Sequence, residues 1–121
     1  MAHEKTAQLP VGSELDAQIA ERIMGWKEVH PQDKARVVYW GKKQDRAGRW
    51  RNARVPDYST EPSLASEVED RIKELGLFER YTRELARIAQ ARGLPAGWAS
   101  PAQRCRAALK TVRTKPRKGT R

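Results

Sequence analysis

Apolar residues recur at intervals of three or four positions in four stretches of the chain, which is the spacing of one face of an amphipathic helix. Helices are therefore predicted between Ser13 and Gly25, between Thr60 and Gly76, between Gly76 and Gly93, and from Ser100 to Arg113. Their inward faces are predicted to be Leu15, Ile19 and Ile23; Ala65, Val68, Ile72 and Leu75; Leu77, Tyr81, Leu85 and Ile88; and Cys105, Ala108, Leu109 and Val112. The four stripes predict a single core, with Ile72 and Leu85 buried on facing helices.

Small polar residues and glycines indicate where these helices begin and end. A capping side chain is expected at three of the four starts, and Gly25 can adopt the left-handed conformation that ends the first helix. Trp26 is then placed to fold back on the last helical turn. The predicted caps are Ser13 with Asp16, Ser59 or Thr60, and Ser100 with Gln103.

The pattern between the first two helices is typical of strands. His30 and Pro31 are expected to break the chain, and the segment 35–40 then ends in two β-branched and two aromatic residues, which strands favour. Residues 44–48 have the composition of a turn, and residues 49–55 are predicted to return as a second strand. Because two strands alone are marginal in water, the sequence predicts an α+β fold with a small antiparallel sheet, one hairpin or slightly more, packed with about four helices.

Composition narrows the class of protein. The chain has 121 residues, 38% hydrophobic and 33% charged, with a mean hydropathy of −0.87. This fits one domain at 13–113, between an unstructured lead at 1–12 and a disordered basic tail at 114–121. One cysteine excludes an internal disulfide, and two distant histidines exclude an ordinary His/Cys metal site. With no apolar run typical of a membrane span or signal peptide, we expect a cytoplasmic protein with no metal, cofactor or membrane partner.

The net charge of +10 is concentrated in two blocks of the sequence. Residues 34–55 hold eight bases and one acid, and residues 93–121 hold eight bases and no acid. A strongly basic block is either a solvated surface or a contact for an anionic partner. Nucleic acid, a nucleotide and an acidic protein surface are the candidate partners.

Catalytic motifs are absent from the sequence, and we expect no enzyme activity. Cys105 falls on a core-facing helical position, where cysteine usually acts as a small hydrophobic residue. The carboxylates between positions 67 and 74 alternate with basic residues, as on a solvated helix face. These carboxylates are Glu67, Glu69, Asp70 and Glu74, and the bases are Arg71 and Lys73.

The basic block from Arg36 to Arg54 also contains Tyr39, Trp40 and Trp50. Cations contact phosphates and aromatic rings stack on bases, so the mixture suits nucleic acid or a nucleotide; alternatively, the aromatic rings form the core between sheet and helices. Trp50 lies between two arginines and is predicted to point to the opposite, buried face. The candidate binding residues are Lys42, Lys43, Arg46, Arg49, Arg51 and Arg54 in the hairpin, and Arg104, Arg106 and Lys110 in the last helix.

Three segments, in this order, resemble the phage ABA-sandwich domain protein family: LDAQIAERIMGWK (15–27), VPDYSTEPSLASEVEDRI (55–72) and QRCRAALKTV (103–112). The residues that carry the resemblance are Gly25, Trp26, Pro56, Tyr58, Ser59, Thr60 and Cys105. The resemblance implies an α-β-α layered fold and an origin in a phage or prophage genome. It implies no established activity and no catalytic residue.

Two functions are therefore expected. The first is a phage-encoded, non-enzymatic accessory protein that binds a host or viral target, such as a host protein or ribonucleoprotein complex, through its basic surface. An anti-defence inhibitor that blocks a nuclease complex or traps a nucleotide signal would be such a protein. The alternative is a nucleic-acid-binding protein that uses the basic hairpin and the C-terminal tail.

Overall fold

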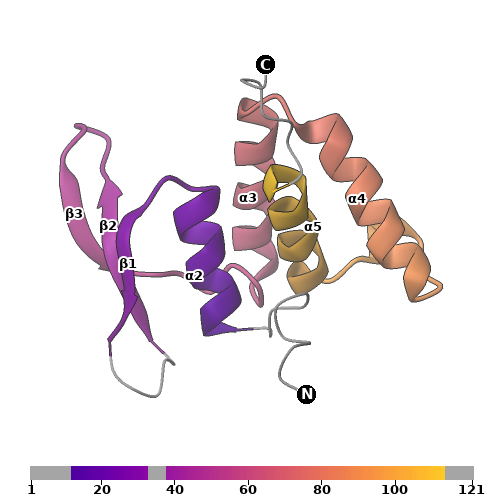
Figure 1. Ribbon diagram of the computed structural model, residues 1–121, viewed down its shortest axis with the longest axis horizontal. Coiled ribbons are helices and arrows are strands. Elements are labelled where there is room, and N and C mark those ends of the chain that lie inside the picture. The colour runs from indigo at the N-terminus through magenta and orange to yellow at the C-terminus, as the bar shows by residue number, and fades with distance from the viewer. Residues whose placement is uncertain (1–11, 33–37, 114–121) are drawn as a thin grey trace.

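Helices and strands follow the predicted order with one strand added (Figure 1). The computed structural model describes residues 12–32 and 38–113, so the predicted tail, most of the predicted lead, and Arg36 lie outside the described residues. The elements are α2 (Ser13–Arg22), β1 (Lys27–Pro31), β2 (Tyr39–Gln44), β3 (Trp50–Arg54), α3 (Pro62–Glu74), α4 (Phe78–Ala91), a 3₁₀ turn (Ala96–Trp98) and α5 (Pro101–Arg113). The α+β class, with a small antiparallel sheet and four α-helices, is confirmed.

The sheet has three antiparallel strands in the order β1-β2-β3. The prediction of a chain break at His30 and Pro31 was wrong, because both residues belong to β1. Proline is tolerated there because it ends an edge strand, where no ladder bond needs its N–H. A bulge lies between Lys27 and His30, and Glu28 within it has a φ of 54°. This irregular pairing removed the alternation by which a strand is recognised.

The predicted hairpin is present, with its first strand further along the chain than expected. β2 covers Tyr39–Gln44 rather than 35–40, of which 35–37 lie outside the described residues, while β3 matches the predicted return strand. In the turn, Asp45 Oδ1 accepts hydrogen bonds of 2.9 Å from the backbone N–H groups of Ala47 and Arg49. Gly48 has the expected positive φ, 84°.

The helices stack outward from one face of the sheet (Figure 1). α2 packs against β1 and β2, and its other side contacts α5, which in turn packs on α3 and α4. The sheet thus lies at one end of the molecule and α4 at the other. The layer order in the described residues is sheet, α2 and then the remaining helices, rather than a sheet between helices.

The core follows the predicted stripes with one exception. Ile72 and Leu85 are buried as expected, and α5 is central because its alanines at 107 and 108 permit close helix approach. Leu75 was predicted to be buried, and this was wrong: it is 41% exposed. Its helix ends at Glu74, so Leu75 lies at the C-cap, where the chain turns toward α4.

Only one of the three predicted caps forms. Gln103 N–H donates to Ser100 Oγ at 3.1 Å and Ser100 N–H donates to Gln103 Oε1 at 2.8 Å, which is a complete capping box. The other two predictions were wrong, because α2 and α3 begin without a side-chain cap. Asp16 instead accepts a 2.7 Å bond from Ser59 N–H, a tertiary contact across 43 positions.

Candidate nucleic-acid interface

The two faces of the sheet differ in what covers them. The side chains of Tyr39, Ala53 and Val55 lie on the face that packs against α2 and are buried or half-buried. Gly41 lies on this face as well, and a Cβ there would stand 3.0 Å from Val29 Cγ2 and 3.2 Å from Trp26 Cε3. The glycine therefore allows the sheet to approach Trp26 closely.

The opposite face, which we call the open sheet face, has no helix packed against it in the described residues. The strand register identifies its members, because directly paired residues share a face: Lys27 pairs with Lys42 and His30 with Trp40, while Lys42 pairs with Asn52 and Gln44 with Trp50. The open sheet face consists of Lys27, His30, Trp40, Lys42, Gln44, Trp50, Asn52 and Arg54, the last as the partner of Trp40.

Trp50 is 40% exposed on this face. The prediction that it belongs to the core was therefore wrong, although the alternation behind it was right: Trp50 and Arg51 do lie on opposite faces. The single helix layer covers the other face of the sheet, and this cannot be inferred from alternation alone. The ammonium of Lys27 stands 4.5 Å from the centre of the Trp50 ring, a cation–π contact.

Trp40 is half-buried on the same face, and its indole N–H donates to Gln32 Oε1 at 3.3 Å. It lies four positions before Gln44 in β2, and Gln44 is the partner of Trp50. At about 3.3 Å per residue, the two tryptophans are about 13 Å apart along the strand direction. They are thus spaced to contact different bases of one extended strand.

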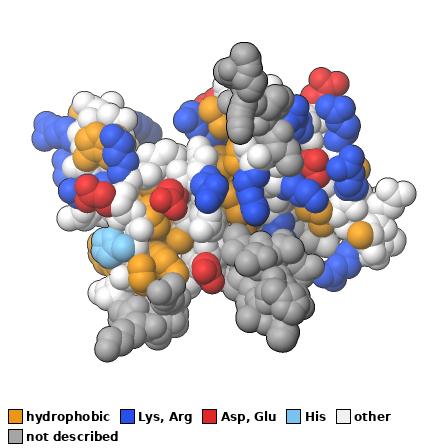
Figure 2. Space-filling model, in the orientation of Figure 1, with side chains coloured by type: hydrophobic (Ala, Val, Ile, Leu, Met, Phe, Trp, Pro, Cys, Tyr) orange, Lys and Arg blue, Asp and Glu red, His pale blue; other side chains and the backbone are white. Residues whose placement is uncertain are grey.

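Exposed cations surround the hairpin end next to this face (Figure 2). Arg46 and Arg49 are exposed, and the Lys43 ammonium lies 5.6 Å from the centre of the Trp26 ring. Arg51 Nε donates to Asp45 Oδ2 at 2.7 Å. This bond, with help from the backbone N–H groups of the turn, holds the pKa of Asp45 below its usual range. The hairpin end therefore brings together four of the predicted binding residues, of which Lys43 and Arg51 pair with each other on the face opposite Trp50.

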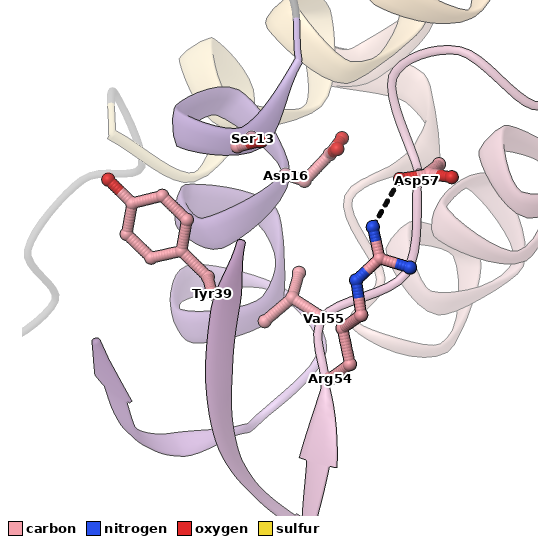
Figure 3. A pocket seen from close by; sticks show the side chains of 6 residues that line it. All are labelled: Ser13, Asp16, Tyr39, Arg54, Val55 and Asp57. Carbon is pink, nitrogen blue, oxygen red and sulfur yellow. Dashed lines mark ion pairs between the residues drawn. The ribbon is translucent and has the colours of Figure 1, made fainter. Parts of the chain in front are cut away.

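Arg54 belongs to the open sheet face by its pairing with Trp40, but its side chain extends past the end of β3 toward Asp57. Its guanidinium lies 4.0 Å from Asp57 Oδ1, beside a small hollow above the start of α2 (Figure 3). The hollow has a volume of about 10 Å³, room for one water. Burial raises the pKa of Asp16, which lines it, even though Ser59 bonds favour the ionised form. The hollow is too small for a ligand, and its polar groups tie α2 to the turn before α3.

The three predicted residues of α5 do not share one surface. Arg104 points inward, with Nη1 2.6 Å from Glu69 Oε2 and Nε donating to the carbonyl of Ala99 at 3.1 Å. The Tyr81 hydroxyl also bonds to Glu69 Oε2, so these three side chains link α3, α4 and α5. Arg106, two positions on and half-buried, and the exposed Lys110 lie elsewhere on the helix.

The residues that carry the family resemblance have structural contacts. The backbone N–H of Trp26 donates to the carbonyl of Ala20 at 2.9 Å, directly after Gly25, whose φ is 83°. The predicted fold-back of Trp26 on the last turn of α2 is therefore confirmed. Tyr58, Ser59 and Cys105 are buried, whereas Pro56 is half-buried and Thr60 exposed. The Cys105 thiol lies 3.4 Å from the Tyr58 carbonyl, and burial raises its pKa to about 12. A thiol with that pKa is protonated at neutral pH and is a poor nucleophile.

Comparison of the chain with protein-family models, curated proteins and solved structures finds no match. Within the described ranges, no three His, Cys, Asp or Glu side chains are grouped so as to hold a metal ion. The helices of the described chain are also too short or too polar to cross a membrane.

Sequence reasoning missed the contribution of β1 to this interface. Lys27 and His30 join the open sheet face only because β1 pairs with β2, and that strand was not predicted. A signal was present in Val29, a single β-branched residue between polar neighbours, but one residue does not establish alternation.

Proposed function

We propose that this protein binds single-stranded nucleic acid on the open sheet face, with Trp40 and Trp50 stacking on bases and the neighbouring cations contacting phosphates. The observation that carries the proposal is the position of two tryptophans on the one sheet face that the described helices leave uncovered. Lys27 and Lys42 lie between and beside them, Arg46 and Arg49 continue the positive charge to the hairpin end, and Arg51 adds a cation there from the opposite face.

The energies favour a base over the contact now made by Trp50. The Lys27 ammonium over the ring contributes about 0.5–1 kcal/mol at an exposed site. A stacked base contributes about 1–3 kcal/mol. A base can therefore replace the ammonium, which remains close enough to contact the adjoining phosphate.

A single strand suits this surface better than a duplex. Stacking requires unpaired bases with exposed faces, and a sheet with aromatic side chains presents broad rings to such bases. A two-stranded ribbon that enters a major groove would instead read base edges with polar side chains. Tryptophans on the contact face therefore favour single-stranded DNA or RNA.

The other expected function, a phage accessory protein that inhibits a host defence complex, remains a proposal that rests on the family resemblance. A nucleotide trap would need an enclosed pocket, and the 10 Å³ hollow beside Asp16 is not one. A host complex with an acidic surface, which resembles nucleic acid in its negative charge, would bind the same basic surface. With the phage origin that the resemblance implies, we propose the cytoplasm of the bacterial host as the location for either role.

The test of the proposal is binding of fluorescein-labelled dT12 and rU12, measured by anisotropy in 50 mM salt. We expect Trp50→Ala to weaken binding at least tenfold, about 1.4 kcal/mol. Trp98→Ala is the matched control, because Trp98 is 74% exposed on the 3₁₀ turn outside the sheet; its affinity should stay within twofold of wild type. Equal affinities of Trp50→Ala and wild type, or no binding by wild type, would reject the proposal.

The hairpin cations are tested by their salt dependence. Replacing Arg46, Arg49 and Arg51 with Gln should lower affinity at least tenfold. Loss of three phosphate contacts should also reduce the slope of log affinity against log salt by about 2, since each contact to a single strand contributes about 0.7. A triple Gln variant at Arg22, Lys73 and Arg92, off the open sheet face, removes the same charge. If both variants lose affinity equally, total charge and not the hairpin is responsible.

A further inference from the structure

A second basic surface lies on α4, at the end of the molecule away from the sheet (Figures 1 and 2). Arg80, Arg83 and Arg87 line, together with Glu84, a hollow of about 310 Å³. Their spacing of three and four positions places the three guanidinium groups on one side of the helix. We call this surface the α4 arginine face.

Glu84 organises the α4 arginine face. Its side chain is only 10% exposed, and Oε2 accepts a 3.4 Å bond from Arg87 Nη1. Its other oxygen, Oε1, is buried without a hydrogen-bond partner. Such a carboxylate is costly to bury unless positive charge surrounds it. Three arginines against one glutamate leave the hollow with a formal charge of +2, so it still favours an anion.

The shape of the α4 arginine face suits a chain of phosphates rather than a single one. Seven positions separate Arg80 from Arg87, which is about 10 Å along a helix at about 1.5 Å per residue. Successive phosphates of a strand rise by about 3.4 Å in a duplex-like conformation, so this length covers about three. The guanidinium fork matches phosphate oxygens in pairs.

We infer that the α4 arginine face is a second nucleic-acid-binding surface, and that one molecule uses it together with the open sheet face to bridge two strand segments. The inference rests on the proposed function of the sheet. α2, α3 and α5 separate the two surfaces, which therefore face different parts of the surroundings. The lining of the α4 hollow is arginine and glutamate, without an aromatic ring, so it contacts backbone phosphates irrespective of base sequence.

A two-strand capture experiment tests the inference. Biotinylated dT12 on beads is saturated with protein and washed, and the retention of fluorescein-labelled dT12 from solution is then measured. Wild type should retain the second strand. The triple variant Arg80→Gln, Arg83→Gln, Arg87→Gln should bind the immobilised strand within threefold of wild type and retain at most a tenth of the second strand. The triple Gln variant at Arg22, Lys73 and Arg92 is the matched control and should retain the second strand as wild type does.

A single change at the exposed Arg83 provides a second variant in case the triple change impairs folding. Arg83→Glu should reduce retention of the second strand at least threefold, with an unchanged melting curve. The inference is overturned if wild type captures no second strand, if the α4 variants capture it as wild type does, if the control loses as much, or if the triple variant also loses the first strand. Failure of wild type to bind even the immobilised strand would instead overturn the proposed function of the sheet.

Discussion

The sheet and the helices of this protein differ in how their side chains are used. The three strands have one face against α2 and one face open, and their ion pairs, Lys42 with Glu28 and Arg51 with Asp45, are largely exposed. Exposed pairs of this kind add little stability. The helices bury nearly all of their apolar stripes, and their pair between Arg104 and Glu69 is about three-quarters buried. The sheet thus carries the proposed base-stacking surface, and the helices carry most of the stability.

The two parts meet at Trp26. This residue follows α2, is buried, and lies against Gly41 of β2. A three-stranded sheet with one covered face needs this contact, because its strands are short and its other face is in solvent. Substitutions can therefore separate stability from binding, and the following predictions test how far that separation holds.

The largest contrast is expected between two tryptophans on opposite faces of the sheet. Trp26→Ala removes a buried ring and should lower the free energy of unfolding by about 3–5 kcal/mol. Trp50→Ala removes an exposed ring and its cation–π contact, and should cost about 1 kcal/mol or less. Urea denaturation followed by circular dichroism measures both. Similar losses for the two variants would mean that the open sheet face is covered in solution.

Within the helices, buried and exposed positions of one stripe should separate in the same way. Ile72→Ala and Leu85→Ala should each cost about 2–5 kcal/mol, because Ile72 is fully buried and Leu85 nearly so. Leu75→Ala, three positions from Ile72, should cost less than about 1 kcal/mol, since Leu75 is 41% exposed. Chemical denaturation midpoints at constant m-value check the order. Binding of dT12 by folded Leu75→Ala should equal that of wild type.

The sequence predicted the helical part of the molecule better than the sheet. The helices from 62 to 113 were evident because each has a long apolar stripe, and Ser100 with Gln103 form a cap within one turn. The caps at Ser13 and Ser59 failed for a different reason. Asp16 and Ser59 bond each other across 43 positions, and no local pattern contains that information.

The candidate site depended even more on tertiary structure. Alternation correctly placed Trp50 and Arg51 on opposite faces of the sheet, but it does not show which of the two faces α2 covers. The cations of the hairpin could be named from the sequence, whereas Lys27 became part of the surface only through the pairing of β1. Arg104 is the reverse case. The sequence predicted it as a binding residue, but its guanidinium bonds to the Ala99 carbonyl and to Glu69 between the helices.

A smaller effect is expected at the link between α2 and the turn before α3. Asp16→Ala leaves the buried Ser59 N–H without its acceptor and should cost about 1–3 kcal/mol. Asp16→Asn keeps an acceptor and removes a buried charge, so at pH 7 its stability should equal or exceed that of wild type. Because burial raises the folded-state pKa of Asp16, the native wild type gains stability as the pH falls through that pKa toward 3.8. Thermal melts from pH 7 to pH 4 should show this gain in wild type. In Asp16→Asn, the part of the gain that comes from Asp16 should be absent.

The smallest effect is expected at the exposed turn of the hairpin, and it is measured as a titration rather than as a loss of stability. The Arg51 bond is the main cause of the lowered pKa of Asp45, with the backbone N–H groups of the turn as further causes. Arg51→Gln should therefore raise the pKa of Asp45 toward its ordinary value of 3.8, as followed by the carboxyl carbon shift in NMR. Because the folded-state pKa of Asp45 lies below its unfolded value, the ionised carboxylate stabilises the fold fully above about pH 4. This stabilisation is lost as the pH falls through the lowered pKa. High salt should shift the wild-type value in the same direction, because the pair is exposed and screened. An unchanged Asp45 titration in Arg51→Gln would show that the turn N–H groups alone set it, and Arg51 would then be wholly available to the nucleic acid.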